Sequence, residues 1–150
     1  YFQNQGGVYM LGDSVKEGKF ENGKLVSIKT VNHEDTEFVA DNFVLASGSF
    51  FSKGLVASQT GVAEPIFGLD IDADSDRGNW FERNMFEAQP YMKFGVATDA
   101  NFHAMKDGKA VENIYVAGSV LSGFNAIKDG CGAGVSILTA LNAADQINVK

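Results

Sequence analysis

The chain has 150 residues, of which 45% are hydrophobic and 21% charged, a composition ordinary for one globular domain. Its formal net charge of −7 argues against nucleic-acid binding and against direct docking on an anionic membrane leaflet, because both partners are negatively charged. The single cysteine, Cys131, excludes a disulfide within the chain and an iron–sulfur cluster held by this chain alone.

No membrane span or secretory signal is expected from the sequence. The longest apolar runs, residues 43–46 and 114–117, are far too short to cross a bilayer. The start carries neither a basic region nor an apolar stretch, so we predict no signal peptide there. Because the chain begins with Tyr1 rather than methionine, we interpret it as a fragment.

The first part of the chain predicts short strands. Residues 7–10 are read as a strand. Two further runs between Val15 and Val31 are separated by Asn22-Gly23, a strong signal for a two-residue hairpin. Residues 24–31 alternate polar and apolar side chains over most of their length, which is typical of a half-buried strand.

A different kind of strand is predicted at residues 43–46. This continuous apolar run ends in Ser47-Gly48, and such a run is typical of a strand buried on both faces of a parallel sheet. Residues 50–93 follow without regular periodicity, and we interpret them as an irregular insert over the active face.

The last third predicts two strands and a helix. The strands are residues 94–99 and 114–117, and Asp107-Gly108 between them marks a turn. The helix covers residues 134–147, because apolar residues recur there at a spacing of three: Val135, Leu138, Leu141, Ala144 and Ile147. These elements together predict a mixed α/β fold.

Small residues follow the predicted strands and indicate a cofactor site. Ser47 and Gly48 would let a flat or charged ligand approach the backbone, although a simple glycine turn explains them too. Gly118 and Ser119 lead to a glycine-rich helix start, whose unpaired N–H groups can hold a phosphate or the electron-rich edge of a flavin. The alternative is a helix start that only packs against the sheet.

Thr98 and Asp99 end a third apolar strand. Their position is explained either by contact with a ligand or by an Asx-type turn after the strand. The predicted cofactor-binding residues are therefore Ser47, Gly48, Thr98, Asp99, Gly118, Ser119, Gly130, Gly132, Ala133, Gly134 and Val135.

Catalytic and substrate-binding residues are less well marked. Arg77 and Lys53, in the insert, are candidates for a substrate phosphate, with surface solvation as the alternative. His103 is a weak candidate for a general base because of its pKa range. No metal site is predicted, since the alternating aspartates of residues 70–76 lack the glycine and glutamate that a calcium loop needs at its sixth and twelfth positions.

The order of these elements resembles the C-terminal half of two-dinucleotide-type flavoproteins. Five segments sharpen the resemblance to the B subunits of anaerobic glycerol-3-phosphate dehydrogenases. They are QGGVYMLGD at residues 5–13, VLASGSFFS at 44–52, EPIFGLD at 64–70, QP at 89–90 and AGSVLSGF at 117–124.

The resemblance implies a partial Rossmann-like flavin-binding domain with a β-meander or hairpin, an irregular insert at residues 50–93 and a C-terminal helix. No G-x-G-x-x-G motif follows a strand near the start, so the N-terminal dinucleotide-binding unit is expected to be absent. We therefore expect that this chain alone binds flavin weakly or not at all, is inactive by itself, and self-associates through its uncovered apolar surface.

For the intact protein the resemblance implies FMN, or alternatively FAD, and oxidation of glycerol 3-phosphate to dihydroxyacetone phosphate with electrons passed towards quinone in anaerobic respiration. The implied partners are the flavoprotein A subunit together with the membrane-anchored iron–sulfur C subunit, which would place the protein in the cytoplasm, peripheral to the inner face of the inner membrane. The alternatives are a non-catalytic protein for assembly or electron relay between those partners, and a related flavoprotein reductase with another substrate.

Overall fold

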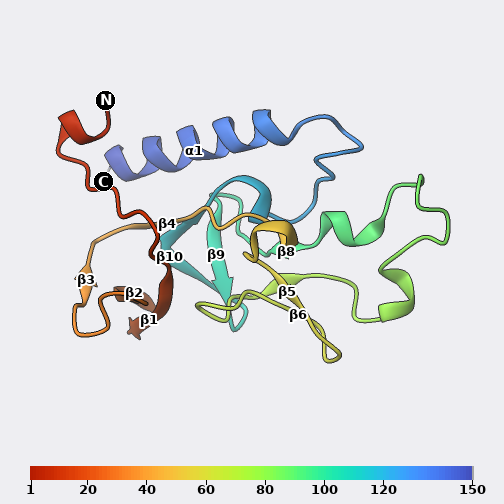
Figure 1. The fold of residues 1–150 in the computed structure, drawn as a ribbon, viewed down its shortest axis with the longest axis horizontal. Coiled ribbons are helices and arrows are strands. Elements are labelled where there is room, and N and C mark those ends of the chain that lie inside the picture. Colours follow the sequence, from red (N-terminus) through yellow and green to blue (C-terminus); the bar gives the residue numbers. More distant parts are fainter. Residues whose placement is uncertain (150) are drawn as a thin grey trace.

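The structure, a computed structural model, describes residues 1–149. Its centre is a three-stranded sheet in the order β4 (Phe43–Leu45), β10 (Lys109–Val116), β9 (His103–Lys106). β10 runs parallel to β4 and antiparallel to β9. Figure 1 shows helix α1 (Gly132–Val149) above this sheet and strands β1 (Val15–Glu21), β2 (Lys24–Thr30) and β3 (Phe38–Val39) below it. The predicted mixed α/β fold is confirmed.

The predicted hairpin is the β1–β2 turn, and two left-handed residues form it. Asn22 has φ 51° and Gly23 has φ 78°, as a two-residue hairpin turn of type I′ requires. β3 pairs antiparallel with β2, so β1, β2 and β3 form the expected meander. The second predicted turn, Asp107-Gly108, joins β9 to β10 with φ 52° and 73°.

One buried amide joins the meander to the central sheet. The Asn113 side chain of β10 donates to the Leu25 carbonyl at 2.7 Å and accepts from the Leu25 N–H at 3.1 Å. Leu25 is fully buried, so these two bonds satisfy backbone groups that water does not reach.

Two of the strand predictions need correction. Residues 7–10 form no strand, and the strand expected at residues 94–99 is reduced to β8 (Gly95–Val96), continued by single bridges from Val96 to Leu121 and from Thr98 to Ala104. The run at residues 43–46 does form a parallel strand, but its predicted burial on both faces is wrong here. β4 is an edge strand, and Val44 is 49% exposed.

The segment of residues 50–93 is irregular, as predicted, with only short elements. β5 (Val56–Ala57) pairs with β6 (Val62–Ala63), and β7 (Ile71–Asp72) pairs with β8. Short 3-10 turns lie at Phe50–Ser52, Arg77–Asn79 and Pro90–Lys93, and outside the segment at Gln3–Gln5 and Gly118–Val120.

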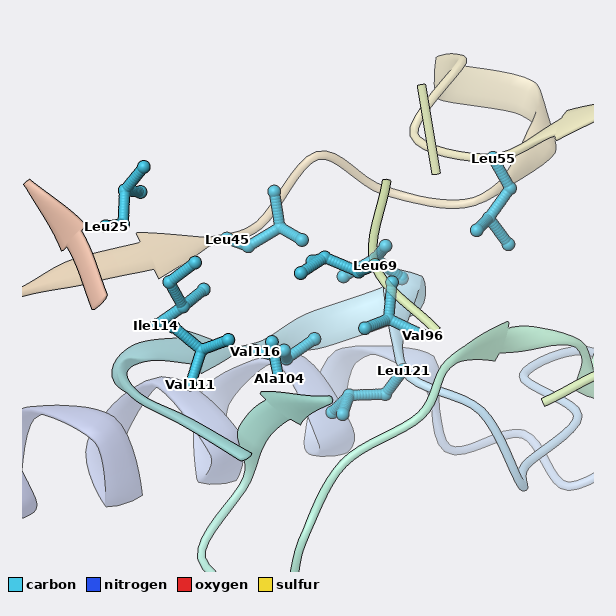
Figure 2. Close-up of a cluster of buried hydrophobic side chains, with 11 residues drawn as sticks. Leu25, Leu45, Leu55, Leu69, Val96, Ala104, Val111, Ile114, Val116 and Leu121 are labelled. Atoms are coloured by element: carbon cyan, nitrogen blue, oxygen red, sulfur yellow. The ribbon is translucent and has the colours of Figure 1, made fainter. Parts of the chain in front are cut away.

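The hydrophobic core lies between the central sheet, the meander and the segment of residues 50–93 (Figure 2). Leu55 and Leu69 of that segment are 2% and 5% exposed, so it contributes to the core rather than only covering it. The core residues are Leu25, Leu45, Leu55, Leu69, Val96, Ala104, Val111, Ile114, Val116, Val120 and Leu121.

The predicted helix is confirmed and begins at Gly132, two residues earlier than expected. It turns Thr139 and Ala143 inward, at 7% and 2% exposure, while Leu138 and Leu141 are 67% and 56% exposed. The apolar spacing therefore predicted the helix but not the face that it buries within this chain. Apolar residues on several sides of a helix, as in α1, are typical of a helix that packs against more than one partner.

Candidate functional site

The candidate site lies where β4 and β10 end together. Because these strands are parallel, their carboxyl ends meet at one edge of the sheet, and the Ala117 N–H donates to the Leu45 carbonyl at 2.9 Å. A Cβ placed on Gly48 would lie 3.7 Å from Ser119 Oγ. The structure thus brings together the two strand ends at which the sequence predicted ligand contacts.

Helix α1 begins at the same edge. The Gly118 N–H donates to Thr139 Oγ1 at 2.9 Å, and Thr139 Oγ1 donates to the Val135 carbonyl at 2.6 Å. A Cβ on Gly118 would lie 3.4 Å from Ser136 Oγ. The turn after β10 is therefore fixed against the second turn of α1, which places the first turn of the helix beside the strand ends.

The first turn of α1 is open to approach from outside. A Cβ added at Gly130 or Gly134 would meet no atom within 4 Å, whereas one at Gly132 would lie 3.3 Å from Ala126 Cβ. The N–H groups of Gly132, Ala133 and Gly134 have no hydrogen-bond acceptor within the helix, because they lie in its first turn. Val135 differs from the prediction, because its N–H donates to the Cys131 carbonyl at 2.9 Å and is not free.

A tight turn follows β4 and leaves one polar atom without a partner. Gly54 packs so closely against the backbone of Gly48 that a Cβ on Gly54 would lie 2.0 Å from the Gly48 carbonyl oxygen. Ser47 Oγ is buried and makes no hydrogen bond with any residue that the structure describes. Buried hydroxyl groups normally have a hydrogen-bond partner, and residues 1–149 supply none to Ser47 Oγ.

A cleft of about 630 Å³ runs along β4 beside this turn. Residues 43–47, residues 65–67, Ser52 and Lys53 line it, together with residues 14–16 of the meander. The cleft follows the open edge of β4, where the strand has no neighbour on the side away from β10.

The turn that contains Asp99 lies beside the end of β10, where the Val116 N–H donates to the Phe102 carbonyl at 2.8 Å, but the Asp99 carboxylate itself is taken up by hydrogen bonds within that turn. Its Oδ1 accepts from the N–H groups of Asn101 and His103, both at 2.9 Å, and its Oδ2 lies 2.9 Å from His103 Nδ1. Burial raises the pKa of Asp99, but the hydrogen bonds from His103 and Asn101 outweigh it, and the pKa is lowered. This geometry favours the Asx-turn alternative.

His103 is buried beneath its neighbours. The residue is 8% exposed, its ring packs 4.9 Å from the ring of Tyr115, and its Nε2 makes no hydrogen bond with any described residue. A general base has to reach the proton that it removes, and a ring so enclosed points to a structural role in this chain.

The two candidates for a substrate phosphate lie apart. Arg77 donates to the Ser58 carbonyl at 3.0 Å and its guanidinium lies 5.3 Å from the centre of the Trp80 ring. Lys53 has φ 63° and lies in the cleft along β4. The structure therefore gives Lys53, but not Arg77, a place near the strand ends.

Sequence reasoning missed two residues that shape the site. Thr139 fixes the turn after β10, and nothing in a helical threonine signals that contact. Asn125 is 2% exposed, and its Oδ1 accepts from the N–H groups of Ile127 and Lys128. The Asn125–Asp129 spacing could have indicated this turn, because asparagine and aspartate commonly bond to the backbone just after them.

Within residues 1–149, no group of three or more His, Cys, Asp or Glu side chains is placed to hold a metal ion. No helix in that range combines the length and apolarity needed to cross a membrane.

Known proteins match this chain strongly. It is 44% identical over 148 residues to the B subunit of the anaerobic glycerol-3-phosphate dehydrogenase of Vibrio cholerae, and the match covers 97% of this chain and 34% of the relative. The B subunits from Actinobacillus succinogenes and Yersinia enterocolitica are 44% and 45% identical, covering 100% and 97% of this chain.

The chain spans about a third of the length of these relatives, namely 36% of the Actinobacillus protein and 34% of the Yersinia protein. No solved structure matches it. The profile of the family described as FAD binding domain matches residues 1–135. This chain therefore belongs to the FAD binding domain family.

Proposed function

We propose that this chain is the part of a flavoprotein dehydrogenase that closes around the ring of the flavin. One observation carries the proposal: the ends of β4 and β10 and the open first turn of α1 meet at a single sheet edge, linked by the Gly118–Thr139 hydrogen bond of 2.9 Å. In α/β proteins, ligands bind outside the carboxyl ends of parallel strands.

The residues at this edge fit a planar, electron-rich group. The free N–H groups of Gly132, Ala133 and Gly134 carry the partial positive charge of a helix start, and no side chain within 4 Å would obstruct approach at Gly134. Ser47 Oγ, which lacks a partner among the described residues, offers a further hydrogen bond. We propose FMN as the cofactor, with FAD as the alternative.

The flavin would supply the two-electron oxidation chemistry. The chain's own contribution would be electrostatic and positional. The N–H groups of the first turn of α1 would favour negative charge at the ring edge that they face, and Gly48, Gly118 and Ser119 would let the ring lie close to the backbone.

The binding site would be completed by residues outside this chain. The relatives are about three times as long, the edge of β4 is unpaired beside an open cleft, and Ile137, Leu138 and Leu141 of α1 are more than half exposed. We propose that a preceding dinucleotide-binding unit covers these surfaces. The chain alone would then bind flavin weakly, be inactive and self-associate.

The names of the relatives extend the proposal to a reaction. The intact protein would take part in oxidising glycerol 3-phosphate to dihydroxyacetone phosphate and pass electrons towards quinone. It would work with the flavoprotein A subunit together with the membrane-anchored iron–sulfur C subunit, and it would be a cytoplasmic protein peripheral to the inner membrane.

A substitution at Gly134 tests the cofactor site in the full-length protein. Gly134→Leu adds bulk where this chain has free space, so the helix should tolerate it, while flavin content falls at least about tenfold. Lys109→Leu, at an exposed position at the end of β10 opposite the site, is the control and should keep its flavin. Flavin retained in Gly134→Leu would count against the proposed site.

Reduction of bound flavin by substrate separates the enzyme from the alternatives. Bleaching of the isolated full-length protein by glycerol 3-phosphate supports a dehydrogenase site within it. A colourless protein that is needed only to join its partners supports the assembly role. A flavin that glycerol 3-phosphate does not bleach, but another reductant does, supports a reductase with another substrate.

A further inference from the structure

Residues 81–90 form a loop that is hydrogen-bonded only to itself and to its own base. Gln89 Nε2 donates to two carbonyls of the loop at 3.1 and 3.2 Å, and Gln89 Oε1 accepts from the Glu82 N–H at 2.9 Å. Every hydrogen bond that the loop makes with residues 1–149 stays between residues 80 and 92. Compact surface loops whose ends lie close together are frequently functional.

The base of the loop is fixed to the body of the protein. The Tyr91 N–H donates to the Trp80 carbonyl at 2.9 Å and so joins the two ends. The centre of the Trp80 ring lies 5.8 Å from that of Phe94, and the centre of the Tyr91 ring lies 6.1 Å from that of Phe50. Residues 81–88, by contrast, are all exposed and project at the end of the molecule away from the meander (Figure 1). The loop can therefore turn on a fixed base without breaking a hydrogen bond to another element.

A groove of about 420 Å³ lies between this loop and the segment that leads into α1. Residues 85–89 line it from the loop, and Asn125, Ile127 and Lys128 line it from the segment before α1. The first turn of α1 begins four residues after Lys128, at Gly132. Closure of the groove would thus move the loop towards the proposed flavin edge.

Two unlike charges line the groove, with Glu87 on the loop and Lys128 on the segment before α1. The ion pairs within residues 1–149 include neither of them. Met85 and Phe86 on the same loop are 78% and 90% exposed. Closure would bring the two charges together and remove apolar surface from water, and both changes favour it.

We propose that residues 81–90 are a lid, which closes this groove when substrate lies at the flavin edge and is held shut by the pair Glu87–Lys128. The proposal rests on the proposed function, because that function places the flavin beside the first turn of α1. The closed lid would exclude water from the flavin edge, and exclusion of water strengthens the electrostatic effect of the N–H groups there.

The test measures backbone hydrogen exchange in the lid of the full-length, flavin-loaded protein. Adding glycerol 3-phosphate should slow exchange in residues 81–90 at least about threefold, because the ligand shifts the lid towards its closed state. Lys128→Glu should abolish this protection and lower kcat/KM at least about threefold, as the loss of an exposed ion pair predicts. Flavin content and Tm should not change.

A charge exchange separates a lid from other roles of the loop. Glu87→Lys combined with Lys128→Glu should restore both the protection and kcat/KM, because the pair is re-formed within one molecule. Glu82→Lys combined with Lys128→Glu is the matched control. Glu82 lies on the same loop but does not line the groove, so this combination should restore neither.

Three outcomes would overturn the proposal. Exchange that glycerol 3-phosphate does not slow, although it bleaches the flavin, would show a loop that takes no part in closure. Slow exchange already without substrate would show that a partner or the protein's remaining chain covers the loop. Failure of the charge exchange to restore protection would show that Glu87 and Lys128 do not meet. Bleaching is measured on the same samples, and its absence together with absent protection would count against the proposed function as well.

Discussion

His103 Nδ1 lies 2.9 Å from Asp99 Oδ2, and the His103 N–H lies 2.9 Å from Asp99 Oδ1, so one carboxylate holds both the ring and the backbone of the residue four positions later. This pair begins β9 and orients the ring against Tyr115, 4.9 Å away. An ionised carboxylate can only accept hydrogen bonds, so His103 Nδ1 is the donor to Asp99 Oδ2.

Asp99→Asn should destabilise the full-length protein in a pH-dependent manner. The hydrogen bonds lower the pKa of Asp99 in the folded state, so its contribution is fully present above the unfolded pKa of about 3.9 and is lost as the pH falls through the lower folded value. At pH 7 the loss should be about 1–2 kcal/mol.

Urea unfolding at several pH values from 7 down to 3 measures this difference. The gap between wild type and Asp99→Asn should shrink at the acid end, while Asp107→Asn, at an exposed turn position, should differ little from wild type. A gap that stays constant with pH would contradict an ionised Asp99 as its cause.

Asn113→Ala should cost about 3 kcal/mol of unfolding free energy. The substitution leaves the N–H and carbonyl of the fully buried Leu25 without partners, and each unsatisfied buried group costs about 1–3 kcal/mol. Urea denaturation of the full-length protein measures it. Glu112→Ala, at the exposed neighbour, should change stability by less than about 0.5 kcal/mol, and equal effects of the two would contradict the role of the amide.

Thr139→Val should weaken flavin binding with little change in side-chain volume. It removes the acceptor of the Gly118 N–H and so releases the turn after β10 from the helix, at a cost of about 1–3 kcal/mol. Thr139→Ser keeps the hydroxyl and should bind flavin close to the wild-type level. Flavin titration of the full-length proteins compares them, and equal weakening in both variants would point to packing rather than to the hydrogen bond.

Gly54→Ala should disturb the turn after β4. Its Cβ would lie 2.0 Å from the Gly48 carbonyl oxygen, a backbone atom that cannot rotate away, and overpacking of this kind costs about 1–3 kcal/mol. Both Tm and flavin content should fall. Gly134→Ala, in open space on a helix, is the matched control and should leave Tm unchanged or raise it; an equal fall in both variants would contradict the steric account.

Local signals in the sequence determined the turns and the element types. Asn22-Gly23 and Asp107-Gly108 predicted two turns correctly because they adopt the left-handed backbone that only a few residue types take readily. The apolar run after Asn42 predicted a parallel strand, and the periodicity after Gly132 predicted the helix. The turns and the helix depend on interactions within a few residues, whereas the parallel strand also needs β10, which is distant in the sequence.

Tertiary structure alone decided which faces are covered and which small residues meet. Val44 and Leu141 are exposed although the sequence marks them as core residues, because burial depends on a neighbour that periodicity does not identify. Thr139 bonds to Gly118 across 21 residues, and Asn113 bonds to Leu25 across 88. The sequence by itself determined the two turns, the hairpin and the helix, because their signals are local. The contacts between distant segments decided where a ligand can lie.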